Sequence, residues 1–126
     1  EMGEAFGHIS RIEPVAKKLQ AAGHTILFVC RDFKIAETWL KPLGYNYIQA
    51  PQSNDGYILS EQPKNYSEIL ISDGYVSSEV LTSKIQAWID IFESFKPDIV
   101  VGDYAPTALL AAKVSKILSF QVEKDR

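Results

Sequence analysis

The sequence contains very little cysteine, no large excess of charge of either sign and no long apolar run. Its single cysteine, Cys30, excludes an internal disulfide framework and a zinc knuckle, and suits a reducing compartment, so we expect a cytoplasmic location. The net charge of -3 argues against nucleic acid or an anionic membrane as a partner, because both attract basic surfaces. No apolar run approaches the ~20 residues that span a bilayer, so no transmembrane segment is expected.

The 126 residues, 46% of them hydrophobic, fit one globular domain and exclude a self-sufficient two-domain enzyme. Helical and strand-like segments alternate along this domain. A capping box formed by Ser10 and Glu13 predicts the first helix, which Gly23 is expected to end. The other expected elements are a strand over residues 24–30, a helix over 34–40, a strand over 45–49, a long loop over 51–65, a short helix over 66–71, a helix from Ser77 or Ser78 to Pro97, a strand over 98–103, a helix over 107–116 and a strand over 118–122.

This order predicts an α/β fold, namely a doubly wound parallel sheet with right-handed crossovers. The first helix begins almost at once, after residues that have the character of a strand-to-helix loop. We therefore expect the first strand of the sheet to lie upstream of Glu1, and the domain to be truncated at both ends.

Ligands of open parallel sheets bind beyond the carboxyl ends of the strands. Two loops are candidates there, residues 3–8 and residues 102–106. The glycines of the first loop permit a tight turn and the close approach of a ligand, but their spacing matches neither the G-x-G-x-x-G pattern nor a P-loop. A plain tight turn without a ligand stays an open alternative for them.

His8 and Asp103 are the candidate reactive pair of these loops. If both lie at the same sheet edge, the carboxylate orients one imidazole nitrogen and the other nitrogen accepts a proton from a hydroxyl. The alternatives are a plain surface histidine and an aspartate that caps the 107–116 helix. Arg11, one turn beyond His8, is expected to orient the histidine, to contact a ligand or to form a salt bridge.

Other reactive or aromatic side chains have structural interpretations. His24 follows a helix-to-strand turn at the opposite sheet edge, and Cys30 is interpreted as a core thiol rather than a nucleophile. Three aromatic residues at helical spacing indicate core packing: Trp88, Phe92 and Phe95. Three tyrosines in the middle region are candidates for lining a substrate pocket or for plain surface positions: Tyr57, Tyr66 and Tyr75. Metal ligands at usable spacing are absent from the sequence.

Two segments of the chain resemble GT-B glycosyltransferases, in particular the UDP-glycosyltransferase-like branch. Residues 7–26 resemble its opening pattern G-H-x-x-R-x-x-P-L-A-x-x-L-x-x-x-G-H-x-V. Residues 96–108 resemble its second hallmark, a P-D-x-V-V-x-D strand with the loop that follows. The resemblance extends from Gly3 to about Ile117.

The resemblance implies a single Rossmann-like domain over residues 1–126, the acceptor-binding half of a two-domain inverting enzyme. His8 matches the general base of the family, and Asp103 matches the aspartate that pairs with it. We expect Gly7, Arg11 and Tyr104 to contact a small-molecule acceptor. No metal or other cofactor is expected, and the nucleotide-sugar donor would bind a C-terminal domain that this chain lacks, so the chain alone is expected to be inactive.

The chain departs from the family pattern at two places. Residues 3–6 replace a run of glycines, and residues 118–126 do not continue toward a donor domain. Two further hypotheses therefore stay open. One is a non-catalytic module or degenerate remnant that docks a separate subunit, and the other is a nucleotide-sugar epimerase-like enzyme of the same fold.

Overall fold

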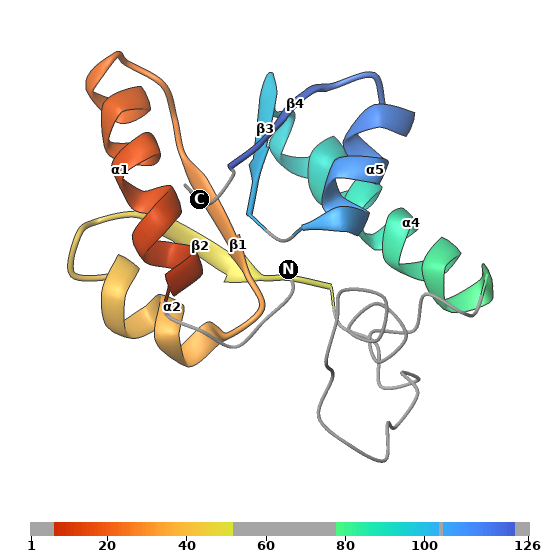
Figure 1. Cartoon of the computed structure of the whole chain (residues 1–126), viewed down its shortest axis with the longest axis horizontal. Helices are drawn as coiled ribbons and strands as arrows, with labels where there is room; N and C mark the ends of the chain where they lie inside the picture. Colours follow the sequence, from red (N-terminus) through yellow and green to blue (C-terminus); the bar gives the residue numbers. More distant parts are fainter. Residues whose placement is uncertain (1–6, 52–77, 104, 123–126) are drawn as a thin grey trace.

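The computed structural model describes residues 7–51, 78–103 and 105–122, with side chains from Ile9 onward. Eight helices and strands alternate along these residues (Figure 1). They are α1 (Gly7–Ala21), β1 (Leu27–Cys30), α2 (Phe33–Leu40), β2 (Asn46–Gln49), α4 (Ser78–Phe95), β3 (Ile99–Gly102), α5 (Pro106–Val114) and β4 (Leu118–Gln121). The loop expected over residues 51–65 extends beyond the described residues after residue 51, and the short helix expected over 66–71 lies wholly outside them.

The strands form two parallel pairs. β1 pairs with β2 in the register Leu27 to Asn46, and β3 pairs with β4 in the register Ile99 to Leu118. Within the described residues β1 and β3 are not hydrogen-bonded to each other. A doubly wound sheet of the order 3-2-1-4-5 has its first strand at this position, between β1 and β3. The upstream strand expected from the sequence stays a prediction.

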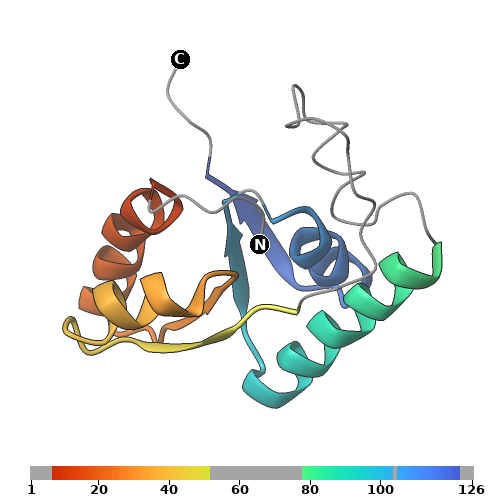
Figure 2. The same cartoon turned by 90° about the horizontal axis from the view of Figure 1, so that it is seen from below.

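The helices cover opposite faces of the strands, as a doubly wound sheet requires (Figure 2). α1 and α2 pack on one face with Phe28 of β1, whereas the neighbouring Val29 packs against the cluster built on α4 and α5. The core on the α1 and α2 side consists of Ala16, Phe28, Ala36, Leu40 and Tyr45. The core on the other side consists of Ala50, Trp88, Phe92, Ala105, Ala108, Ala111 and Ala112.

The helix ends follow local signals in the sequence. Gly23, at φ 94°, ends α1, and the amide of His24 bonds the carbonyl of Leu19 at 3.1 Å. The carboxylate of Asp32 caps α2 by accepting the amide of Ile35 at 3.0 Å. Pro106 occupies the start of α5, where its missing N–H costs no helical hydrogen bond.

Three local expectations were wrong. α1 begins at Gly7, so Ser10 lies inside the helix and forms no capping box, and Pro14 stands within the helix. The strand expected from His24 begins only at Leu27, because its partner β2 begins at Asn46, opposite Leu27. Phe95, expected in the core, is 39% exposed because it ends α4, whereas Trp88 and Phe92 are buried as expected.

Candidate functional site

The central contact of the candidate site joins α1 to the loop after β3. The Nε of Arg11 donates a hydrogen bond to Oδ2 of Asp103 at 2.9 Å, and the two charges form a salt bridge. The Asp103 side chain is only 3% exposed and that of Arg11 is 28% exposed. A carboxylate this deeply buried needs a charged or hydrogen-bonding partner, because desolvation alone would strongly disfavour its ionised form.

The position of Asp103 is determined by the end of β3 at Gly102, whose backbone lies close to α5. A Cβ at position 102 would come within 3.2 Å of the side chains of Ala105 and Leu109. Glycine therefore lets the chain pass close to α5 without displacing these side chains, and Asp103 follows directly after the strand. The residue that caps α5 is Ala105, which makes no side-chain hydrogen bond to the helix. Asp103 is thus an ion-pair partner of Arg11 and not the helix cap that the sequence left open.

α1 carries the other candidate residues of this edge. Gly7 is its first residue and His8 its second, so the backbone of His8 lies three positions, or about one helical turn, before that of Arg11. Tyr104 lies outside the described residues. The structure therefore brings Arg11 and Asp103 together, and places the helical position of His8 next to that of Arg11 along α1.

Two polar side chains near this edge were missed by sequence reasoning. The amide nitrogen of Gln49, at the carboxyl end of β2, donates to the carbonyl of Arg31 at 2.6 Å and so ties β2 to the loop after β1. Thr107, in the first turn of α5, is fully buried, and its Oγ1 has no hydrogen-bond partner among the described residues. Neither side chain belongs to a recognisable pattern, so the sequence offered no signal for them.

The remaining candidates take structural positions. His24 is exposed in the turn between α1 and β1, away from the carboxyl ends of the strands. Cys30 packs against the α1 and α2 core, and burial raises the pKa of its thiol from 9.0 to about 11. Tyr57, Tyr66 and Tyr75 lie outside the described residues. In the part of the chain that is described, no group of three or more histidine, cysteine or acidic side chains is arranged to hold a metal ion.

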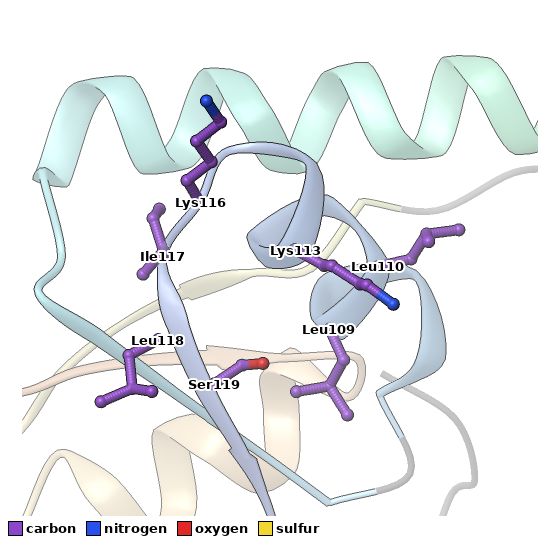
Figure 3. A pocket seen from close by; sticks show the side chains of 7 residues that line it. All are labelled: Leu109, Leu110, Lys113, Lys116, Ile117, Leu118 and Ser119. Carbon is purple, nitrogen blue, oxygen red and sulfur yellow. The ribbon is translucent and has the colours of Figure 1, made fainter.

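An open groove lies elsewhere on the surface, between α5 and the start of β4 (Figure 3). Its lining residues are Leu109, Leu110, Lys113, Lys116, Ile117, Leu118 and Ser119. This lining comes from α5, the turn after it and the amino end of β4, whereas Asp103 follows the carboxyl end of β3. The groove is therefore distinct from the site around Arg11 and Asp103.

Comparison with known proteins supports a glycosyltransferase relationship. The chain is 32% identical over 127 aligned positions to an uncharacterized glycosyltransferase of Methanosarcina acetivorans, an alignment that covers 91% of this chain and 29% of that protein. It also superimposes on CalG4, the calicheamicin glycosyltransferase, with a TM-score of 0.61 at 19% identity, over 94% of this chain and 30% of that one. No family profile matches the chain. The chain thus spans about a third of the length of the proteins it matches.

These similarities confirm the expected fold, a Rossmann-like α/β domain as found in GT-B glycosyltransferases. Among the described residues, no helix is both long enough and apolar enough to cross a membrane.

Proposed function

We propose that this chain, a relative of a glycosyltransferase that shares the GT-B fold, is the acceptor-binding part of an inverting glycosyltransferase. The complete enzyme would move a sugar from a nucleotide-sugar donor to an acceptor hydroxyl. The observation that carries the proposal is the contact between Arg11 and Asp103. It draws the N-terminal turns of α1, which include His8, and the loop after β3 to the same edge of the strands, where ligands of parallel sheets bind.

His8 is the general base of the proposed reaction. Asp103 accepts a hydrogen bond from one imidazole nitrogen and so selects the tautomer whose other nitrogen removes the proton of the acceptor hydroxyl. The acceptor oxygen attacks the anomeric carbon of the donor as the bond to the nucleoside diphosphate breaks. The attack comes from the face opposite the leaving group, so the anomeric configuration inverts.

Gly7, Arg11 and Tyr104 are the proposed acceptor contacts. Gly7 opens α1, where the absence of a side chain permits a ligand to approach the backbone. Arg11 contacts the buried Asp103 carboxylate and is itself partly exposed, so it can also contact a ligand. Gly7 and Arg11 stand one position before and three positions after His8 along α1, and Tyr104 follows Asp103 in the sequence.

The donor is proposed to bind a second domain, because the chain spans only 29% of its glycosyltransferase relative. The 126-residue chain alone is then expected to transfer no sugar from UDP- or dTDP-sugars. Transfer by the purified chain would contradict this part of the proposal.

The role of His8 is tested in the longer enzyme that the proposal requires. His8→Ala is expected to lower kcat by about 10²–10⁴-fold, since it removes a positioned base, while donor binding stays unchanged. His24→Ala is the matched control, because His24 is exposed in a turn at the far edge and its loss is expected to leave kcat unchanged. Near-normal turnover of His8→Ala would remove the assignment of the base.

A separate donor-binding subunit is the second candidate arrangement, and the surface of the molecule favours it. Several large apolar side chains of β3, α5 and β4 are exposed: Ile99, Leu110, Val114, Leu118 and Phe120. Ile99, Leu118 and Phe120 share one face of the paired strands, and exposed apolar groups of this kind mark interaction sites, so this face suits the attachment of a further domain or subunit. Sedimentation of the chain with a co-expressed donor domain distinguishes a stable heterodimer from two parts that associate only when covalently linked.

An epimerase-like activity of this fold requires the chain itself to bind the nucleotide. Calorimetry with UDP separates the two hypotheses, because the acceptor-domain proposal expects no UDP binding by the chain alone.

A further inference from the structure

The outer edge of β4, on the side away from β3, is not paired with another strand. β4 pairs in parallel with β3, and within residues 7–51, 78–103 and 105–122 it has no second strand as a neighbour. An open edge is a template for a further strand, and proteins commonly protect it with charged residues or proline. β4 has the sequence Leu-Ser-Phe-Gln and contains neither. Its outer edge is therefore open to pairing.

The backbone of β4 directs hydrogen-bonding groups toward this outer edge. The amide of Val122, directly after β4, donates to the carbonyl of Gly102 at 2.8 Å and so points toward β3. Backbone groups alternate in direction along a strand, so the N–H and C=O groups of Ser119 and Gln121 point away from β3. An antiparallel strand can satisfy all of these groups, because opposite residues of a hydrogen-bonded pair exchange two bonds.

The apolar side chains of β4 stand next to the outer edge and are exposed. Leu118 and Phe120 lie beside Ile99 and Val101 of β3 on one face of the strands. The opposite face carries Val100, which packs against the core on α4 and α5. Leu118 is 59% exposed and Phe120 is 53% exposed. The edge thus combines unpaired backbone groups with apolar side chains that a second strand would partly cover.

β2, the last strand on the other side of the molecule, is better protected. The ring of Tyr47 lies 5.3 Å from that of Phe33 in α2, measured between centroids, and it packs against the core on α1 and α2. The side chain of Gln49 bonds the carbonyl of Arg31 at the end of the same strand. The open, apolar edge is therefore that of β4.

We propose that two copies of this chain associate through the outer edges of their β4 strands, which pair antiparallel across a two-fold axis. The occupant is a second copy because the edge complements itself. When Ser119 of each copy pairs with Gln121 of the other, the outward groups of both strands are satisfied. Phe120 then lies opposite Phe120 of the second copy in a non-hydrogen-bonded pair. Side chains approach most closely in such pairs, and aromatic pairs there stabilise a sheet.

The groove beside β4 agrees with this arrangement (Figure 3). Leu109 and Leu110 of α5 line it together with Ser119 of β4. A two-fold axis perpendicular to the sheet keeps both α5 helices on the same side of the joined strands, so the second α5 approaches this groove. It would cover Leu110, which is 39% exposed. The pairing extends the exposed apolar face of β3 and β4 without covering it, so it does not compete with the attachment of a further domain.

Sedimentation of the purified 126-residue chain, with a reductant that keeps Cys30 a thiol, tests the proposal. The mass is expected to rise from that of one chain to that of two as the concentration increases. Phe120→Lys places like charges opposite each other and is expected to abolish the dimer. Gln121→Pro removes an amide that points away from β3 and is expected to do the same. Leu43→Lys, the same charge at a 56% exposed position in the turn after α2, is the matched control and should dimerise like the wild type.

Two outcomes would overturn the proposal. One is a chain that stays monomeric at every concentration, which would leave the edge to a strand of a different protein. The other is a dimer that persists in both β4 variants after circular dichroism has shown that they are folded, because the copies would then meet through another surface.

The register of the pairing has a test of its own. A mixture of the Phe120→Lys and Phe120→Glu proteins is expected to restore the dimer, although neither variant dimerises alone. Opposite charges then face each other at the two-fold axis. If the mixture stays monomeric while the wild type dimerises, Phe120 does not lie opposite its counterpart and the antiparallel pairing of β4 is overturned.

Discussion

The Nε of Arg11 and the Oδ2 of Asp103 lie 2.9 Å apart, although 92 residues separate them in the sequence. The contact joins the half of the molecule built on β1 and β2 to the half built on β3 and β4. It lies at the sheet edge where the sequence suggested a catalytic pair. This single ion pair is therefore expected to matter for stability as well as for the proposed chemistry.

Replacing Arg11 by Met is expected to lower the free energy of unfolding by about 1–3 kcal/mol, because it leaves the buried Asp103 carboxylate without this partner. Adding Asp103→Asn should cost less than the sum of the single changes, with a coupling of about 0.5–3 kcal/mol. Urea denaturation of the four proteins of this cycle provides the measurement. Strict additivity would show that the ion pair contributes nothing of its own, and Lys18→Met is the control for loss of a positive charge on α1.

Leu40→Ala is expected to lower the free energy of unfolding by about 2–5 kcal/mol, because Leu40 is fully buried between α1, α2 and the strands and the change leaves a cavity. Leu43→Ala is the same chemical change three residues later at a position that is 56% exposed. It should stay within about 0.5 kcal/mol of the wild type. Equal losses in urea denaturation would contradict the observed burial.

Gly102→Ala is expected to destabilise the protein by about 1–3 kcal/mol, because the new Cβ would stand 3.2 Å from the side chains of Ala105 and Leu109. Since Gly102 precedes Asp103, the same change is expected to weaken the contact with Arg11. Leu109→Ala removes two of the three close atoms. The double variant should therefore lose less stability than the sum of the two single changes, a relation that thermal or urea denaturation measures directly.

Alkylation of Cys30 by iodoacetamide at pH 8 is expected to be about 100-fold slower in the native chain than in urea, because only the thiolate reacts and burial raises the pKa of the thiol from 9.0 to about 11. The folded state thus favours the neutral thiol. The raised pKa of Cys30 therefore contributes to the stability of the fold in full below pH 9, and this contribution is lost as the pH rises from 9 toward 11. Cys30→Ala should lack this part of the pH dependence, and equal alkylation rates in the two states would refute the burial of the thiol.

The elements that the sequence predicted best are those with strong local signals. α4, expected from Ser77 or Ser78 to Pro97, extends from Ser78 to Phe95, and α2, expected over residues 34–40, extends from Phe33 to Leu40. β1 was predicted three residues too early because its apolar run extends beyond the point at which β2 begins to pair with it. The length of a strand depends on its partner, which no local pattern encodes.

In the candidate site, too, local features could be predicted from the sequence and contacts between distant segments could not. That Asp103 follows a buried strand at the ligand-binding edge could be predicted from residues 98–103 alone. That Arg11 contacts its carboxylate could not, because this contact depends on where α1 lies relative to the loop after β3, which no local pattern encodes. The structure shows Arg11 at the carboxylate.

The alternation of helix and strand in the sequence determined by itself the α/β class and the two loops that hold the candidate residues, and the patterns of residues 7–26 and 96–108 carried the family resemblance. These properties are local and depend on periodicity and turn residues. The burial of Asp103, the close approach of Gly102 to Ala105 and Leu109 and the ion pair with Arg11 were decided only by the tertiary structure. They arise from contacts between segments far apart in the chain, and packing alone sets how closely those segments approach.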